Sequence, residues 1–126
     1  MDFNHVNIKA PMRLLEKERE FFCEVLNLKE GFRPEFNNRG FWLYAGDKAI
    51  VHLTEAAGED ANHRINQGYI DHLAFQSSGA RDFVTTLNKL KIAYTTCYIN
   101  EINTQQVFFR SPLDIRIEVA FTGEKI

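Results

Sequence analysis

The chain has 126 residues, with 15 Lys and Arg side chains against 17 Asp and Glu, and a formal charge of −2. Hydrophobic residues make up 44% and charged residues 25%, the balance of an ordinary globular domain, which excludes a disordered or low-complexity chain. Like charges form no block, so a nucleic-acid partner is not expected, because phosphate binding requires a basic stripe.

The first half of the chain predicts a strand, a helix and three further strands. Apolar and polar residues alternate at the start, which indicates a strand. After Pro11, apolar residues recur on one helical stripe, with the charged residues mostly away from it. Gly46-Asp47 supplies the turn between the last two strands. The expected elements are a strand at Phe3–Lys9, a helix from about Arg13 to Leu26 with Leu14, Phe21, Phe22 and Val25 on its stripe, and strands at Glu30–Phe36, Phe41–Ala45 and Ala49–Thr54.

The second half repeats this order after a linker, residues 56–68, which has no apolar period. His63 lies in the linker and is assigned to solvent. Ser77-Ser78-Gly79 indicates a helix start. Two βαβββ modules, residues 1–55 and 69–126 of a single domain, predict an α+β fold with mainly antiparallel pairing. The expected elements of the second module are strands at Ile70–Gln76, Tyr94–Ile99, Gln105–Arg110 and Ile115–Phe121, and a helix with Phe83, Val84, Leu87 and Leu90 on one face.

The two halves overlay each other at an offset of about 66 residues. This overlay pairs His5 with His72 and His52 with Glu118. His52 follows His5 by 47 residues and Glu118 follows His72 by 46, so each half has one potential metal ligand near its start and another near its end. The matching segments are FNHVNIKA with IDHLAFQ, and GFWLYAGDKAIVHL with QVFFRSPLDIRIEV.

Strand parity places these four side chains on one face. Successive side chains of a strand face opposite sides of a sheet, and the apolar ones must meet the helices. The three imidazoles and the carboxylate therefore fall on the uncovered face, where they suit a transition metal ion better than Mg²⁺ or Ca²⁺, which take mostly oxygen ligands. The alternative, in which each histidine is satisfied by a neighbour, is less favoured because three of the four histidines occupy repeat-related positions.

Paired βαβββ modules with this ligand order resemble the vicinal oxygen chelate superfamily, which includes glyoxalase I, methylmalonyl-CoA epimerase, the extradiol dioxygenases and the fosfomycin- and bleomycin-resistance proteins. The resemblance implies a cupped, mainly antiparallel sheet and one divalent transition metal ion (Zn, Ni, Co, Fe or Mn) on His5, His52, His72 and Glu118. Asp114 replaces the glycine of the family's Asp-Pro-x-Gly ending and tolerates the left-handed conformation. The segments that carry the resemblance are NHVNI, AIVHL, DHLAFQ and QQVFFRSPLDIRIEV.

The resemblance implies that the metal takes two oxygens of a small, anionic substrate and stabilises an enediolate or a related oxyanion. Many glyoxalase-type members have a carboxylate at the position of His52. If His52 binds the metal, two adjacent sites stay open and lyase or isomerase chemistry is favoured. If it does not, the other three ligands form a facial triad, which favours a ring-cleaving dioxygenase or a fosfomycin-type transferase. Glu118 and His52 are the candidate catalytic acids or bases.

Two arginines of the second half are candidate substrate ligands. Arg116 shares the free face with Glu118 and could clamp a carboxylate or phosphonate. Arg110 is explained equally well as a solvated rim residue. Trp42 and Phe108 are repeat partners that could line a cup, but packing in the core or at a dimer interface is favoured.

A function of a different class stays open, that of a metal-free, drug-sequestering protein of the bleomycin-resistance kind. The resemblance also implies a homodimer that takes a small-molecule substrate. No window is long and apolar enough to cross a bilayer, and the N-terminus lacks the regions of a secretory signal. Cys23 and Cys97 form no CxxC motif and are interpreted as reduced core thiols. These observations predict a cytoplasmic protein without a membrane partner.

Overall fold

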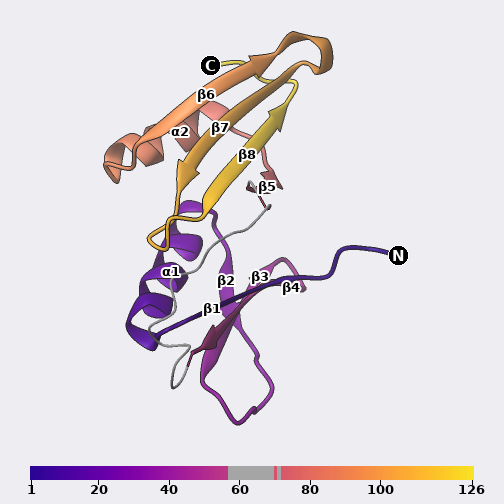
Figure 1. Ribbon diagram of the computed structural model, residues 1–126. Helices are drawn as coiled ribbons and strands as arrows, with labels where there is room; N and C mark the ends of the chain where they lie inside the picture. The colour runs from indigo at the N-terminus through magenta and orange to yellow at the C-terminus, as the bar shows by residue number, and fades with distance from the viewer. Residues whose placement is uncertain (57–69, 71) are drawn as a thin grey trace. The chain divides into compact units, whose positions relative to one another are not determined.

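The computed structural model describes residues 1–56, 70 and 72–126, and the chain divides into two compact units, residues 1–66 and 67–126. The predicted order of elements, repeated in each half, is confirmed (Figure 1). Most of the predicted linker, with His63, lies outside the described residues. The first unit contains β1 (Val6–Ala10), α1 (Met12–Val25), β2 (Lys29–Gly31), β3 (Gly40–Ala45) and β4 (Lys48–Glu55). The second contains β5 (Leu73–Gln76), α2 (Ala80–Lys89), β6 (Tyr94–Ile99), the 3₁₀-helix η2 (Asn100–Ile102), β7 (Thr104–Arg110) and β8 (Arg116–Thr122).

Each unit is built on a four-stranded sheet, and the two sheets share one topology. Their strand orders are β1-β4-β3-β2 and β5-β8-β7-β6. Strand β1 pairs with β4 in parallel, and β5 pairs with β8 in the same way, while all other neighbouring strands are antiparallel. The α+β class with mainly antiparallel pairing is therefore confirmed. The registers repeat as well, since Trp42 lies opposite His52 and Phe108 lies opposite Glu118.

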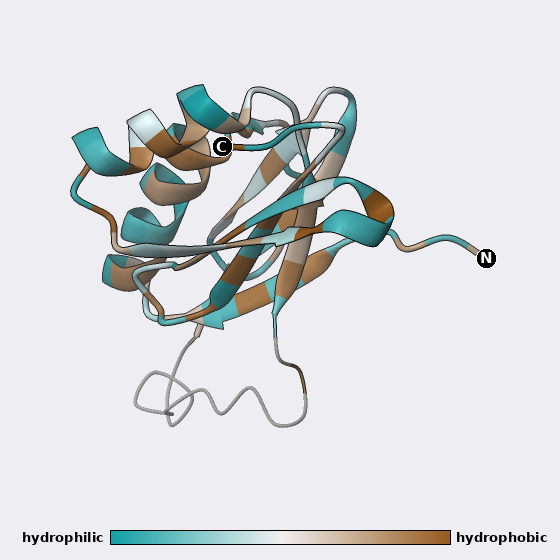
Figure 2. Cartoon of the chain, turned by 90° about the horizontal axis from the view of Figure 1, so that it is seen from above, coloured by the Kyte–Doolittle hydropathy of each residue, from teal (hydrophilic) through white to brown (hydrophobic). Residues whose placement is uncertain are grey.

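Helix α1 buries a stripe that shares two of its four residues with the predicted one. Phe22 and Val25 are buried as expected, but Leu15 and Glu18 complete the stripe, while Leu14 and Phe21 are only half-buried. The spacing of the observed set is that of one helical face, and the fully buried charged Glu18 interrupts its apolar pattern. Helix α1 packs on β3 and β4, and Figure 2 shows both helices banded in hydrophilic and hydrophobic colours.

The start of α2 is fixed by a carboxylate from the far end of its unit. Gly79, the N-cap residue, has a positive φ of 84°. The backbone N–H groups of Gly79 and Ala80 donate to the two carboxylate oxygens of Glu124 at 2.8 and 2.7 Å. The bond from Ala80 is the main cause that holds the pKa of Glu124 below its usual value, and the bond from Gly79 adds to the effect. An anion at a helix N-terminus is favourable because the first N–H groups have no partner within the helix.

Replacing Glu124 with glutamine is expected to lower the urea midpoint of unfolding at neutral pH, since the neutral amide has a single acceptor oxygen and one of the two backbone N–H groups loses its partner. The pKa of Glu124 is lower in the folded state, so the stabilisation is fully present above the unfolded-state pKa and disappears as the pH falls through the folded-state pKa. The midpoints of variant and wild type should therefore converge in acid. A difference that does not change with pH would contradict this role.

The prediction of a strand at Glu30–Phe36 is wrong beyond its first two residues. Strand β2 ends at Gly31, and residues 32–39 form a loop that leads into β3. The reason is Pro34, which has no N–H group to donate to a ladder and restricts the conformation of the residue before it. The loop carries Arg33 and Phe36 to the face of the sheet opposite α1, where they line a cavity.

The interpretation of both cysteines as core thiols is also wrong. Both are free, but Cys97 is exposed on β6, the last strand in the order of its sheet, and Cys23 is half-buried. Burial is the main cause that raises the pKa of the Cys23 thiol. Among the helices that the structure describes, none is long and apolar enough to span a membrane.

Candidate functional site

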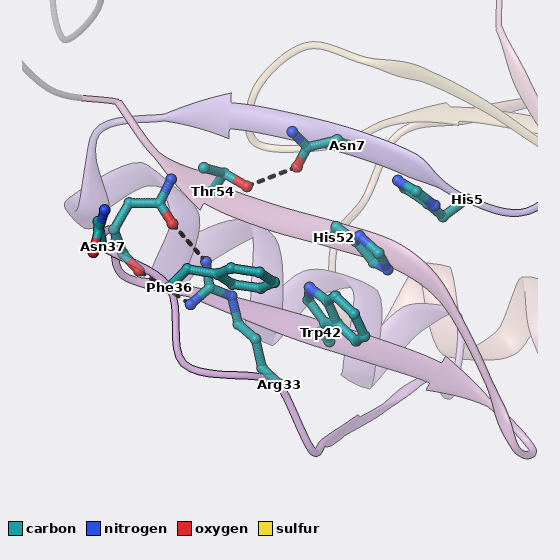
Figure 3. A pocket seen from close by; sticks show the side chains of 9 residues that line it. His5, Asn7, Arg33, Phe36, Asn37, Trp42, His52 and Thr54 are labelled. Carbon is teal, nitrogen blue, oxygen red and sulfur yellow. Dashed lines mark hydrogen bonds between the residues drawn. The ribbon is translucent and has the colours of Figure 1, made fainter.

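The two predicted ligands of the first unit belong to a stack of three flat side chains. Trp42 on β3 and His52 on β4 are cross-strand partners, and their ring centroids lie 4.0 Å apart with 8° between the planes. His5 directly precedes β1. The centroid of its ring lies 3.8 Å from that of the His52 ring, with 15° between the planes. Figure 3 shows His52 between the other two rings. The neighbouring Val51 and Leu53 are fully buried, so parity turns His52 to the sheet face opposite α1.

Hydrogen bonds fix which nitrogen of each ring carries the proton. Nδ1 of His5 lies 2.7 Å from Oδ1 of Asn4, and Nε2 of His52 lies 3.1 Å from the backbone carbonyl of Ala49. Both partners are oxygen acceptors, so these two nitrogens are the protonated ones. In the neutral rings the lone pairs therefore lie on Nε2 of His5 and on Nδ1 of His52. A histidine that binds a metal ion usually donates its other N–H group in this way.

His52 is held in its neutral form. Burial of the ring is the main cause that lowers its pKa; His5 and then Arg33 lower it further, while the bond to Ala49 opposes them. At neutral pH the ring therefore carries a lone pair rather than a second proton, which is the state required of a metal ligand or of a general base.

The two predicted ligands of the second unit contact each other directly. Nε2 of His72 lies 2.9 Å from Oε2 of Glu118, whose side chain is only 8% exposed. Nε2 of Gln106 donates to Oε1 of Glu118 at 2.7 Å. The His72 and Phe108 rings form a T-shaped pair, with centroids 5.8 Å apart and planes at 86°. The carboxylate is thus fixed at both oxygens, by an imidazole and by an amide.

The His5–His52 pair lines a cavity of about 300 Å³ in the first unit. Side chains from β1, β3, β4 and the loop 32–39 surround it (Figure 3). A second hollow of about 470 Å³ shares Trp42 and His52 with it. The described residues that line the first cavity are His5, Asn7, Arg33, Phe36, Asn37, Asn38, Trp42, His52 and Thr54.

The predicted metal ligands are residues of the types that bind divalent transition metal ions. Each unit supplies one pair, and the set of three imidazoles and one carboxylate matches the preferences of such ions. No group of three or more His, Cys, Asp or Glu side chains that could hold an ion is found in the part of the chain that the structure describes. Stacked rings direct their in-plane lone pairs alongside each other, so one ion can bind both His5 and His52 only if one ring leaves the stack.

The two predicted substrate arginines lie in different surroundings. Arg116 stacks over Phe108, with its guanidinium carbon 4.5 Å from the ring centroid, and Phe108 in turn meets His72. Arg110 is exposed, and its Nη1 donates to the backbone carbonyl of Asp114 at 2.7 Å. It stabilises the turn in which Asp114 has a φ of 63°, the left-handed conformation expected at that position.

Three residues of these clusters were not among the predicted site residues. Gln106 could have been found, because it has the same parity on its strand as Phe108, which faces Glu118. Trp42 was considered, but packing in the core or at a dimer interface was favoured for it. Arg33 gave no signal, because the sequence placed it within a continuous strand.

Solved structures with the same arrangement of elements were found along nearly the whole chain. A protein of the glyoxalase family from Bacillus anthracis is 22% identical, with a TM-score of 0.75, 97% of this chain and 95% of that chain covered. A glyoxylase/bleomycin resistance protein/dioxygenase domain from Frankia sp. is 21% identical, with a TM-score of 0.71 and coverages of 97% and 98%. The fosfomycin resistance protein FosX from Listeria monocytogenes, in complex with Mn(II) and 1S,2S-dihydroxypropylphosphonic acid, is 12% identical, with a TM-score of 0.70 and coverages of 96% and 92%.

The chain has the vicinal oxygen chelate fold. The resemblance inferred from the sequence is therefore confirmed at the level of the fold. No family model and no curated protein matches the sequence. With identities below 25%, the neighbours establish the vicinal oxygen chelate fold alone, and the activity has to be argued from the side chains.

Proposed function

We propose that this protein is a divalent-metal-dependent enzyme of lyase or isomerase type that acts on a small, oxygenated, anionic substrate. His5, His52, His72 and Glu118 are the proposed ligands of one transition metal ion. The observation that carries the proposal is the repetition of the two pairs. His5 directly precedes β1 and His72 directly precedes β5, while His52 and Glu118 occupy equivalent positions opposite Trp42 and Phe108.

The metal ion, when bound, would act as a Lewis acid that stabilises an oxyanion of the substrate. The chain's own residues hold and move the proton. Nδ1 of His52 has the lone pair because Nε2 is bonded to Ala49, and the lowered pKa keeps Nδ1 unprotonated at neutral pH. The same lone pair would bind the ion, so His52 can accept a proton only when it is detached from the ion. Glu118 is the second candidate, and Gln106 fixes its orientation through Oε1. FosX, which has the same fold, holds Mn(II) and a phosphonic acid, which supports a metal and an anionic substrate.

The stack around His52 favours a second candidate function. A ring held between Trp42 and His5 is well placed to stay off the metal. His5, His72 and Glu118 would then form a facial triad with three open positions, as a ring-cleaving dioxygenase or a fosfomycin-type transferase requires. In that case His52 acts as the acid or base rather than as a ligand.

Elemental analysis of protein purified without chelator or nickel resin tests the proposal. About one transition metal ion per protomer is expected in wild type, and it should be lost in His72→Ala. Retention of the metal in His52→Ala would select the second candidate function. Failure of wild type to contain or take up zinc, nickel, manganese, cobalt or ferrous iron would overturn both, and would favour a metal-free sequestering protein. The cytoplasmic location, the homodimer and the division into modules 1–55 and 69–126 stay predictions.

A further inference from the structure

The loop between β2 and β3 holds one guanidinium group firmly at the cavity of the first unit. Nη1 of Arg33 donates to the backbone carbonyl of Asn38 at 3.1 Å, and Nη2 donates to Oδ1 of the same residue at 2.8 Å. The guanidinium carbon lies 4.7 Å from the centroid of the Phe36 ring. Two hydrogen bonds and an aromatic face thus fix the cation before any ligand arrives, which reduces the entropy lost on binding.

Arg33 still has donors to offer. A guanidinium carries N–H groups on all three nitrogens, and the bonds to Asn38 use one on each Nη. Its Nε is buried and finds no hydrogen-bond partner among the described residues. Because Nε is buried, the donors that remain for a ligand oxygen are the second N–H groups of Nη1 and Nη2, which the bonds to Asn38 do not use. Figure 3 shows the Arg33 side chain beside Phe36, on the same side of the sheet as Trp42 and His52.

The other polar groups of the cavity favour an anion too. The hydroxyl of Thr54 donates to Oδ1 of Asn7 at 2.8 Å, which leaves the N–H groups of the Asn7 amide for a ligand. The described residues that line this cavity include no Asp or Glu, although the chain as a whole has a formal charge of −2. The cavity therefore concentrates positive charge and hydrogen-bond donors within a slightly acidic protein.

We propose that this cavity binds the oxyanion group, a carboxylate or a phosphonate, of a small organic ligand, and that Arg33 is the cation that anchors it. The inference rests on the proposed function, because His5 and His52 line the same cavity and the anchored group would belong to the substrate. Arg33 determines specificity in this proposal, and it takes no part in proton transfer.

Trp42 makes the proposal directly measurable, because it is the only tryptophan of the chain and lines the cavity. The metal-free protein is titrated with sodium acetate and, separately, with sodium methylphosphonate at constant ionic strength, and the fluorescence of Trp42 is recorded. Wild type should show a saturable change with at least one of the two anions, and the two titrations distinguish a carboxylate from a phosphonate site. Arg33→Gln should weaken that binding by at least about tenfold, the effect expected for hydrogen bonds to a charged group.

Arg13→Gln is the matched control, since it removes the same charge from an exposed position on α1 of the same unit. It should leave anion binding unchanged, and circular dichroism checks that each variant is folded. Arg33→Lys, which keeps the charge but not the planar fork, should bind with intermediate affinity. The proposal is overturned if neither anion gives a saturable change, if Arg33→Gln binds like wild type, or if Arg13→Gln loses as much affinity. Without metal in the assay, these results are independent of the metal content that tests the proposed function.

Discussion

Replacing Glu118 with glutamine is expected to weaken metal binding by more than about a hundredfold. Glu118 is the only carboxylate of the proposed ligand set, and a neutral amide oxygen is a much poorer ligand for a divalent ion. Loss of an outer-shell partner alone typically costs about 10- to 100-fold in affinity, so loss of the ligand itself should exceed that range. Calorimetric titration with Zn²⁺ measures the change, and the new amide oxygen can still accept the hydrogen bond from Gln106.

Two further variants serve as a control and as an intermediate case for the loss of metal affinity. Glu101→Gln removes the same charge from an exposed position on η2 and should bind Zn²⁺ like wild type. Gln106→Leu removes the bond that orients Glu118, so its affinity should fall by about 10- to 100-fold, between the other two. Equal affinities for Glu118→Gln and wild type would remove Glu118 from the ligand set, whatever the metal content of the wild-type protein.

Alanine at Gly40 is expected to lower the free energy of unfolding by about 3 kcal/mol or more, at the upper end of the range for overpacking. A Cβ atom at Gly40 would lie 2.0 Å from the backbone carbonyl oxygen of Leu53, which no rotation of a side chain can relieve. Strands β3 and β4 would have to separate where they pair at Gly40 and Thr54. The same Cβ would lie 3.1 Å from Nη2 of Arg33, so anion binding should weaken as well.

Gly46→Asn is the control for this effect. Gly46 lies in the β3–β4 turn with a φ of 62°, nothing lies within 4 Å of a Cβ placed there, and asparagine tolerates the left-handed conformation. Its unfolding free energy in urea should stay within about 0.5 kcal/mol of wild type. If the two glycine variants were equally stable, the close approach at Gly40 would not control the pairing of β3 with β4.

The elements that the sequence predicted well are those whose local pattern agreed with their tertiary position. Strand β6 has the predicted bounds, Tyr94–Ile99. The overlay of the two halves correctly anticipated the common topology, because a shared register repeats residue by residue. Helix α1 was placed correctly, but its buried face was misjudged because Glu18 is a charged residue in a buried position. Burial of that kind depends on the whole unit and leaves no trace in a hydropathy pattern.

In the candidate site, too, the residues on regular strands were predicted and the residue in an irregular loop was not. Parity and repeat were enough to bring His5 to His52 and His72 to Glu118, because both depend on the regular geometry of strands. Arg33 could not be found in this way. Its position depends on Pro34 ending the ladder and on Asn38 capturing the guanidinium from within an irregular loop. Loops obey no side-chain period, so the residues that they bring to a cavity have to be observed.

The pairing of each unit's first strand with its last also sets the order of events as the chain folds. His5 and His52 are separated by 47 residues and His72 and Glu118 by 46, and the members of each pair come together only through β1–β4 or β5–β8. Closing such long loops is entropically costly, and contacts of this kind form slowly. A nascent or partly folded unit therefore carries isolated imidazoles with little affinity for an ion or an anion. A metal ion or an anion bound as proposed would therefore stabilise the folded units and not the partly folded chain.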